Sequence, residues 1–368
     1  MGIQTIAVLG AGNGGCAAAA DLTLRGYEVR LYSRSESTLK PLIERGGIEI
    51  VEGWRASFAR PQLMTRDMDD AVAGADLIMI AAPAIGHEYL GRKLAPHLTD
   101  GQVILLNPGH TGGSLHLASV LLGAGLKAKV KICETVTLTY ICRIIGLARV
   151  EIYRRTERLA WAALPGKLNA ELHGEISKIY PSIVPAENVI ETGLCNINAI
   201  MHPAGMVANA GRIERSQGDF YFYRDGITPA IANVIGAVDQ ERLKIVERLG
   251  LAARSFVEIF YQAGLTTEAA HTSGSVYQAI RDSLPNRTIK SPKSLDHRYL
   301  HEDVGYGLVP MAEIAKLVGV ETLVIDSLIA LASKMNRLDY RKEGLTLEKM
   351  GLGNVRPEDL LRLLQKGF

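Results

Sequence analysis

The fold of this chain is decided by its opening residues, which read Ile6-Ala7-Val8-Leu9-Gly10-Ala11-Gly12-Asn13-Gly14-Gly15 and continue as Cys16-Ala17-Ala18-Ala19-Ala20. An apolar strand runs here into a glycine turn and then into a helix of small residues. Gly10 permits the tight turn, Gly12 lets the backbone approach a pyrophosphate, and Gly15 lets the helix lie close to the strand. The helix N-terminus offers unpaired N–H groups to an anion. The sequence therefore predicts a dinucleotide site rather than a plain tight turn, with these ligands: Gly10, Gly12, Asn13, Gly14 and Gly15.

The length of 368 residues exceeds the size at which a single hydrophobic core usually keeps growing. Two domains are expected, a dinucleotide-binding domain over residues 1–185 and a helical substrate and catalytic domain over residues 186–368. The 41 basic and 39 acidic residues nearly cancel, and no long basic run occurs. The charge balance gives no support for a nucleic-acid or membrane partner and favours small-molecule ligands.

The cysteines give no sign of a metal site. Cys16, Cys133, Cys142 and Cys195 are far apart, and no histidine stands at zinc-ligand spacing from them. The chain starts without a basic segment and a cleavage site, and charged residues, histidine or proline interrupt every long apolar stretch. These features predict a cytoplasmic protein.

Short apolar runs follow the glycine turn at residues 28–32, 76–82, 103–106 and 130–133, with helical segments expected between them. Buried parallel strands have this pattern because helices cover both faces of the sheet. Residues 180–185 are expected to form the crossing between the two domains. From residue 188 onward helical periods prevail, including residues 230–249, 311–317 and 321–335. The sequence therefore predicts an α/β fold, in which a Rossmann domain with a doubly wound parallel sheet precedes an all-helical C-terminal domain. In that second domain the apolar stretch 323–331 suits a homodimer interface as well as a core helix.

The carboxyl ends of parallel strands meet at one edge of a sheet, where ligands bind. The stretches that end there include Ser33-Arg34-Ser35, Pro83 to His87, and Glu134-Thr135, so Pro83 and Glu134 are further candidate cofactor ligands. An NAD site usually has an acid after the second strand, but Ser33 and Arg34 stand at this place. A guanidinium between hydroxyls suits a 2′-phosphate, which favours NADP over NAD. The alternative is that Arg34 is solvated and Glu36 reaches the ribose.

Two stretches of the second half carry groups capable of chemistry. In the first, Asn196 to Pro203, the side chains of Asn198 and His202 share a face if the segment is helical, and Pro203 interrupts the helix hydrogen bonding. The second, Asp296 to Gly305, is a charged run that would ordinarily be a solvated loop. A structural histidine at a helix break is as compatible with the first stretch as a catalytic one.

Four ordered motifs occur in this half. They read Asn-x-Asn-Ala-x-Met-His-Pro (196–203), Tyr-Arg-Asp-Gly-Ile-Thr-Pro (223–229), Arg-Tyr-x-x-Glu-Asp-Val-x-x-Gly-Leu-Val-Pro (298–310) and Tyr-Arg-Lys-Glu-Gly-Leu-Thr-Leu-Glu-Lys-Met-Gly-Leu (340–352). The first half adds Pro83-Ala84-Ile85, Asn107-Pro108-Gly109-x-Thr-Gly-Gly, and Glu134-Thr135 followed by Cys142-Arg143. With these motifs the chain resembles the opine dehydrogenases of the octopine and nopaline type, and most of all the bacterial N-(1-D-carboxyethyl)-L-norvaline dehydrogenase branch. The chain departs from the branch at Ser33, where the branch carries an acid, so the choice of nucleotide does not carry over.

The resemblance implies that an amino acid and a 2-oxo acid condense to an imine, which a nicotinamide cofactor, NADP or NAD, then reduces. By this resemblance His202 matches the catalytic histidine, Asp303 its carboxylate partner, and Arg298 the arginine that holds a substrate carboxylate. His87 also falls on a family-like position and is a candidate substrate ligand, as is Asn198 on the His202 face. Histidine suits proton donation because it titrates near neutral pH, and a neighbouring carboxylate fixes its tautomer.

Two other functions are compatible with the same architecture. One is an NAD(P)-dependent reductase of a 2-oxo or hydroxy acid without an amine, as in the glycerol-3-phosphate, ketopantoate and hydroxyacid dehydrogenases, which usually rely on a lysine in the helical domain. The other is a non-catalytic dinucleotide sensor, which has no need of the motif around His202. Four further histidines are expected to have no catalytic role: His110, His271, His297 and His301.

Overall fold

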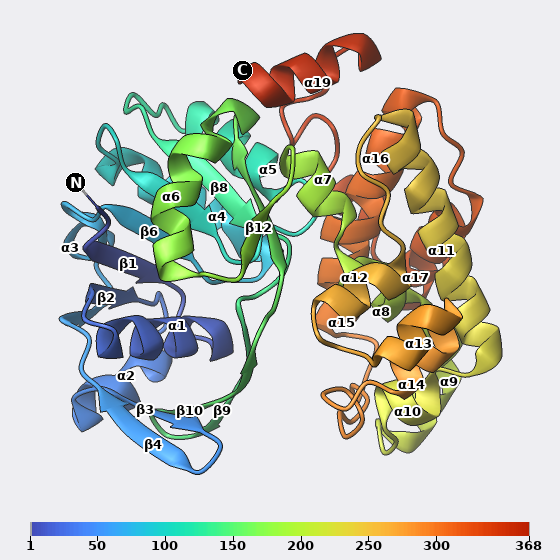
Figure 1. Cartoon of the computed structure of the whole chain (residues 1–368), viewed down its shortest axis with the longest axis horizontal. Coiled ribbons are helices and arrows are strands. Elements are labelled where there is room, and N and C mark those ends of the chain that lie inside the picture. Colours follow the sequence, from blue (N-terminus) through green and yellow to red (C-terminus); the bar gives the residue numbers. More distant parts are fainter. Residues whose placement is uncertain (1, 368) are drawn as a thin grey trace. The chain divides into compact units, whose positions relative to one another are not determined.

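The computed structural model describes residues 2–367 of the chain, which form two compact units (Figure 1). The first unit contains residues 2–109, 113–189 and 363–367, and the second contains residues 110–112 and 190–362. The segment 110–112 therefore belongs to the second unit, although it follows a strand of the first. The last residues of the chain return to the first unit.

The first unit contains a large twisted sheet. Its strands, in spatial order, are β12 (Ile183–Pro185), β11 (Leu159–Leu164), β8 (Lys131–Thr135), β7 (Val103–Leu106), β6 (Leu77–Ile80), β1 (Thr5–Leu9), β2 (Glu28–Tyr32) and β5 (Leu63–Thr65). All neighbours from β8 to β5 are parallel. Read from β5 to β8, the strands have the order 3-2-1-4-5-6 of doubly wound dinucleotide folds, which confirms the predicted Rossmann sheet.

The sheet departs from the predicted all-parallel arrangement at one edge. Strand β11 runs antiparallel to β8, and β12 pairs with β11. The segment 183–185, which the sequence suggested as a crossing between domains, is thus an edge strand of the first unit. Strand β12 has only three residues and ends in proline, so periodicity alone gave little signal for it.

A second sheet of four strands was missing from the sequence-based expectation. Its order is β4 (Arg55–Ala59), β3 (Ile48–Glu52), β10 (Arg149–Arg155) and β9 (Tyr140–Gly146). The pairing of β3 with β10 is parallel, whereas the outer pairings are antiparallel. Several strand positions are charged and exposed, because one face of this sheet meets solvent. The apolar runs that reveal the large sheet are therefore absent here.

The helices of the first unit cover its sheets. They are α1 (Asn13–Leu24), α2 (Glu36–Arg45), α3 (Met68–Val72), η1 (Ala84–Gly86), α4 (His87–Leu94), η2 (Ala95–His97), α5 (Gly113–Gly123), η3 (Gly166–Leu168) and α6 (Asn169–Ile179). Strands β6 and β7 are completely buried, and their apolar side chains form a core with those of α3, α4 and α5. Continuous apolar strands are expected where helices lie on both faces.

Helix α1 lies between the two sheets, since it contacts β1 and β2 of the large sheet and all four strands of the small one. Residues 15–22 of this helix are all buried. A helix packed between two sheets is largely apolar and needs small side chains to let both sheets approach. The run of alanines at residues 17–20 meets both conditions.

The second unit is helical. Its elements are α7 (Val189–Leu194), α8 (Ile197–Ala208), α9 (Ala210–Ser216), α10 (Phe222–Gly226), α11 (Pro229–Arg248), α12 (Phe256–Gln262), α13 (Glu268–Ser273), α14 (Val276–Arg281), α15 (Arg298–Asp303), the π-helical turn η4 (Val304–Leu308), α16 (Val309–Val318), α17 (Leu323–Asn336), α18 (Tyr340–Glu343) and α19 (Pro357–Lys366). Helix α7 begins in the first unit and α19 ends there. Helix α8 is central, with α11, α12, α15, α17 and η4 packed around it. Within residues 2–367, no helix combines the length and apolarity needed to cross a membrane.

The predicted helices at residues 230–249, 311–317 and 321–335 correspond to α11, α16 and α17. Helix α17 buries Ile325, Leu328 and Ile329, which explains its apolar pattern as a core helix. Leu323 and Leu331 on the same helix are exposed.

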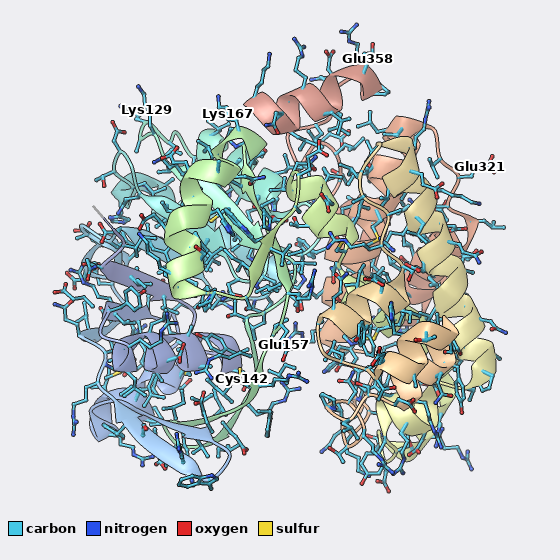
Figure 2. All side chains as sticks on the ribbon, viewed as in Figure 1. Lys129, Cys142, Glu157, Lys167, Glu321 and Glu358 are labelled. Carbon is cyan, nitrogen blue, oxygen red and sulfur yellow. The ribbon has the colours of Figure 1, made fainter. Side chains whose placement is uncertain are left out.

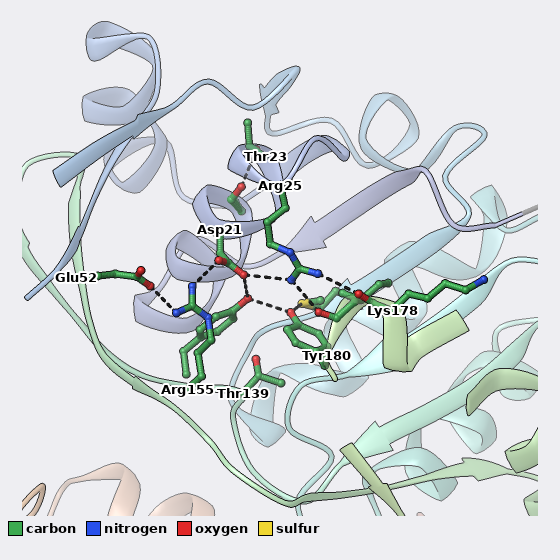
Figure 3. Close-up of polar contacts among 12 residues, drawn as sticks. Asp21, Thr23, Arg25, Glu52, Thr139, Arg155, Lys178 and Tyr180 are labelled. Carbon is green, nitrogen blue, oxygen red and sulfur yellow. Dashed lines mark hydrogen bonds and ion pairs between the residues drawn. The ribbon is translucent and has the colours of Figure 1, made fainter. Parts of the chain in front are cut away.

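A buried polar network centred on Asp21 fastens α1 to its surroundings (Figure 3). The Asp21 carboxylate accepts a hydrogen bond of 2.8 Å from the Tyr140 hydroxyl of β9 and forms an ion pair of 2.6 Å with Arg155 of β10. Arg25 reaches the same carboxylate at 3.4 Å and donates to the carbonyl of Ile179 at the end of α6. Burial and the neighbouring Asp21 charge raise the pKa of Tyr140 well above its usual value, so its hydroxyl remains a donor. One carboxylate thus joins α1 to the small sheet and to α6.

We predict that Asp21→Ala lowers the free energy of unfolding of the first unit by about 1–3 kcal/mol, because the buried Tyr140 hydroxyl loses its acceptor and Arg155 keeps only its ion pair with Glu52. Denaturant unfolding measures this change. The control is Glu157→Ala, which removes the exposed ion pair with Arg154 (Glu157 is labelled in Figure 2) and should cost less than about 1 kcal/mol. Equal losses in the two variants would contradict the assigned role of Asp21.

Candidate active site

The glycine turn after β1 contains three glycines that the structure uses in different ways. Gly10 has φ +118°, and a Cβ there would lie 2.5 Å from the Ala81 carbonyl oxygen. A Cβ at Gly15 would overlap the carbonyl oxygen of Gly10, so this glycine sets the close approach of α1 to the turn. At Gly12, however, φ is −80°, and no atom of the described neighbours lies within 4 Å of a Cβ. The protein itself does not need a glycine at Gly12.

The open space at Gly12 fits a pyrophosphate. Gly12 is the N-cap of α1, no side chain caps the helix there, and the first turn carries no acid. The free N–H groups and the positive end of the helix dipole therefore face a space without a competing negative charge. The residues present thus match what a dinucleotide requires.

The other two predicted ligands of the turn, Asn13 and Gly14, have structural contacts. The Asn13 side chain accepts a hydrogen bond of 2.8 Å from the Ile144 N–H of β9, and a Cβ at Gly14 would collide with Leu138. The side-chain oxygen of Asn13 therefore holds the small sheet against the turn.

The end of β2 presents a cationic edge. Ser33 is buried and its Oγ accepts from the Ser35 N–H at 3.3 Å, while Ser35 caps α2. Arg34 is exposed and lies over the Tyr89 ring at 5.3 Å. Among residues 2–367, no carboxylate lies within ion-pair distance of Arg34, and Glu36 pairs with Arg66 at 2.8 Å instead.

Two other predicted ligands of the first unit are enclosed by protein. Glu134 is completely buried, and its Oε2 accepts a hydrogen bond of 2.9 Å from the Ser114 N–H in the first turn of α5. His87 is also completely buried, and its ring lies close to Gly113. Pro83 is exposed at the start of η1. Burial favours packing and capping roles for Glu134 and His87, while Pro83 remains accessible to a ligand.

The second unit brings together the histidine and carboxylate that the sequence singled out. The Nδ1 atom of His202 on α8 lies 2.7 Å from Oδ2 of Asp303 at the end of α15. Both residues are buried, His202 at 5% and Asp303 at 2% exposure. The Nε2 atom of His202 lies 2.7 Å from the Tyr223 hydroxyl, and the Tyr299 ring stacks on the imidazole with 3.7 Å between centroids. Each ring nitrogen therefore has one defined partner.

Local sequence explains how these groups meet. Helix α8 continues past Pro203 to Ala208, which keeps His202 in a regular helix. A Cβ at Gly205 would lie 2.7 Å from the Phe222 ring, and a Cβ at Gly307 would lie 2.5 Å from Ala199. These glycines allow α10 and η4 to approach α8 closely. Asn198, on the same helix, is partly exposed.

A second buried ion-pair system lies next to the first. Glu302 is 2% exposed and pairs with both the Arg298 guanidinium, at 2.6 Å, and Nε2 of His110, at 2.9 Å. The Arg298 side chain is 57% exposed, so its guanidinium is anchored on one side and open on the other. An anchored, accessible guanidinium can hold a carboxylate bidentately.

Sequence reasoning missed four residues of this site: Tyr223, Tyr299, Glu302 and His110. The first three lie inside the quoted motifs, beside the residues that were chosen. The charged run at 296–305 looked like a solvated loop, whereas the structure buries two of its acids, Glu302 and Asp303, and leaves Asp296 exposed. Nothing in the sequence indicated a role for His110. Its ion pair with Glu302 becomes visible only in the structure, where residues 110–112 belong to the second unit.

An open glycine turn on a Rossmann sheet and a buried histidine–carboxylate pair with an anchored arginine define a nicotinamide-dependent dehydrogenase. Residues 185–336 match the family described as NAD/NADP octopine/nopaline dehydrogenase, alpha-helical domain, and residues 6–109 match Ketopantoate reductase PanE/ApbA. The opine dehydrogenase of Arthrobacter sp. (strain 1C) is 37% identical over 353 residues, which cover 96% of each chain. The chain therefore belongs to the opine dehydrogenase family.

Solved structures agree with this assignment at the level of fold. Octopine dehydrogenase in complex with NADH and L-arginine has a TM-score of 0.78 at 20% identity, covering 97% of this chain and 98% of that one. Yersinopine dehydrogenase with NADP⁺ has a TM-score of 0.75 at 15% identity, covering 99% and 98%. The chain is an NAD(P)-dependent oxidoreductase that acts on a CH–NH group and joins an amino acid to a 2-oxo acid.

We predict that Gly12→Ala abolishes NADPH binding while changing the free energy of unfolding by less than about 1 kcal/mol, because the added methyl group enters only the ligand space. The matched substitution Gly15→Ala should instead destabilise the first unit by about 1–3 kcal/mol or more, since its Cβ overlaps the Gly10 carbonyl. Nucleotide fluorescence titration and denaturant unfolding separate the two effects. Unchanged NADPH affinity in Gly12→Ala would contradict the assignment.

We also predict a pH dependence of stability that comes from His110. Burial alone lowers the pKa of His110, but its ion pair with Glu302, helped by Asp303, outweighs burial and raises it. A raised pKa means that the folded state binds the proton more tightly than the unfolded state. The stabilisation is therefore complete below about pH 6.5, the unfolded value, and is lost as pH rises through the folded pKa.

The test compares the melting temperature of the wild type and His110→Gln across this range. The difference between them should shrink as pH rises above neutrality. His97→Gln serves as the control, because His97 pairs with an exposed carboxylate, Asp69, and contributes little. A difference that stays constant with pH would overturn the prediction.

Proposed function

We propose that His202 and Asp303 act as one proton-donating unit in the reductive condensation, and that Arg298 holds a substrate carboxylate. The observation that carries this proposal is the buried hydrogen bond of 2.7 Å between His202 Nδ1 and Asp303 Oδ2. Loss of the carbonyl oxygen as water, which forms the imine, requires a proton donor near that oxygen. A carboxylate at Nδ1 fixes the proton there and leaves Nε2 as the nitrogen that exchanges a proton with the substrate side.

The nicotinamide dinucleotide, when bound, supplies the hydride that reduces the imine carbon. In the first unit the N–H groups at Gly12 and Asn13 hold the pyrophosphate. In the second unit Arg298, anchored by Glu302, orients a substrate carboxylate and leaves proton transfer to His202. The substrates we assign are an amino acid and a 2-oxo acid, in line with the solved octopine dehydrogenase complexes with L-arginine and with pyruvate.

We further propose that NADP is preferred to NAD. Arg34 is exposed, lies over the Tyr89 ring and has no carboxylate partner among the described residues, so its guanidinium is available to a 2′-phosphate. The competing ribose ligand, Glu36, is engaged by Arg66. A carboxylate at the end of β2 would repel the phosphate, but Ser33 stands at this place.

Arg34→Ala is expected to raise the Kd for NADPH by roughly tenfold to a hundredfold and to leave that for NADH nearly unchanged, since one charge-assisted hydrogen bond is worth about 1.5–3 kcal/mol. Arg60→Ala is the control, because Arg60 also lies over an aromatic ring, that of Phe58, on the small sheet. Equal losses for NADPH and NADH would refute the phosphate role.

The proton-donating unit is tested by a double-mutant cycle. His202→Asn and Asp303→Asn should each lower kcat by about 10²–10⁴, and the double variant should lose little more than the larger single loss. NADPH affinity should stay close to that of the wild type, because the glycine turn belongs to the other unit. Losses that add in the double variant would show that the two residues act independently.

A further inference from the structure

We propose that Tyr223 is a catalytic residue, which carries the proton from His202 to the substrate oxygen. This inference rests on the proposed function, because it takes His202 as the source of the proton. The observation behind it is that His202 Nε2, the nitrogen left for proton transfer, already lies 2.7 Å from the Tyr223 hydroxyl.

The surroundings of His202 leave this hydroxyl as the route for the proton. Nδ1 is bonded to Asp303, and the Tyr299 ring covers one face of the imidazole with only 12° between the planes. The Phe222 ring meets the imidazole edge-on, with 6.3 Å between centroids. Only 5% of the His202 surface is exposed. The Nε2 proton therefore leaves through the Tyr223 hydroxyl, which already lies next to that nitrogen.

The chemistry of a phenol suits this task. A tyrosine hydroxyl donates one hydrogen bond and accepts others at the same time, so it can take a proton from one neighbour while giving its own to another. The Tyr223 hydroxyl also lies 3.3 Å from the hydroxyl of Tyr299. The polar groups therefore run from the buried Asp303 through His202 to the Tyr223 hydroxyl, and the partly exposed Tyr299 lies beside that hydroxyl.

The relay acts when the carbinolamine loses water. In the carbinolamine formed from the two substrates, the C–O bond breaks and its electron pair leaves with the oxygen. That oxygen takes the proton of Tyr223, and Tyr223 takes the Nε2 proton of His202. The nitrogen lone pair forms the C=N bond, so the products are water and an iminium ion. Tyr223 is neutral before and after the step, and His202 has lost one proton.

The experiment is steady-state kinetics of Tyr223→Phe with NADPH, a 2-oxo acid and an amino acid. Removing the hydroxyl should lower kcat by about a hundredfold, the usual scale of a general-acid contribution, with little change in the Kd for NADPH. The matched control is Tyr340→Phe, because the buried Tyr340 hydroxyl also lies 2.8 Å from a histidine nitrogen, that of His301. This control should keep the kcat of the wild type.

A proton inventory gives a readout that a merely structural role would not move. The rate in mixtures of H₂O and D₂O should depend on deuterium content along a curve in the wild type, because two protons move in one step, and along a straight line in Tyr223→Phe. If Tyr223→Phe does not fold, the wild-type curve alone decides. A straight line in the wild type, or a kcat that survives the substitution, overturns the relay.

The activities of His202→Asn and Tyr223→Phe together distinguish an error in the relay from an error in the proposed function. If His202→Asn is inactive while Tyr223→Phe retains its rate, His202 donates directly and only the relay is wrong. If His202→Asn is itself active, the proposed function is wrong, and the relay falls with it.

Discussion

The hydrogen bond between His202 and Asp303 is the interaction on which the second unit depends. Taking a carboxylate and an imidazole out of water is costly unless both find partners, so the protein around them must satisfy every remaining polar atom. Tyr223 meets the free nitrogen of His202, and the neighbouring Glu302 is neutralised by Arg298 and His110. The packing of α8, α10 and α15 is therefore fixed by polar pairing as well as by apolar burial.

A steric constraint plays the corresponding part in the first unit. Helix α1 lies between two sheets, and its approach to β1 requires the absence of a side chain at Gly15. The same close packing leaves Gly12 without neighbours at the helix N-terminus. The fold thus requires Gly15, whereas Gly12 is required only by the ligand. This difference identifies the ligand site within the turn.

The sequence predicted the parts of the molecule whose signals are local. Apolar runs revealed β1, β2, β6, β7 and β8, since strands buried on both faces carry such runs. The small sheet was not predicted because its strands are half exposed and lack continuous apolar runs. In addition, the pairing of β3 with β10 joins segments about a hundred residues apart. No local pattern encodes that distance.

The site shows the same division. The motif resemblance pointed to His202, Asp303 and Arg298, and the structure brings them into one region. The resemblance could not identify Glu302 as the link between Arg298 and His110. This link forms only because residues 110–112 belong to the second unit. Burial of Glu134 and His87 was equally beyond the sequence, since Glu134 ends a strand of the sheet and His87 begins the helix after another, where such sheets bind their ligands.

The measurement that tests the central claim most directly is NADPH oxidation with a 2-oxo acid alone, an amino acid alone, and both together, with the product identified by its mass. The account predicts oxidation only with both substrates, a product in which the two are joined through a secondary amine, and loss of this activity in His202→Asn. Oxidation at the same rate with the 2-oxo acid alone would contradict it.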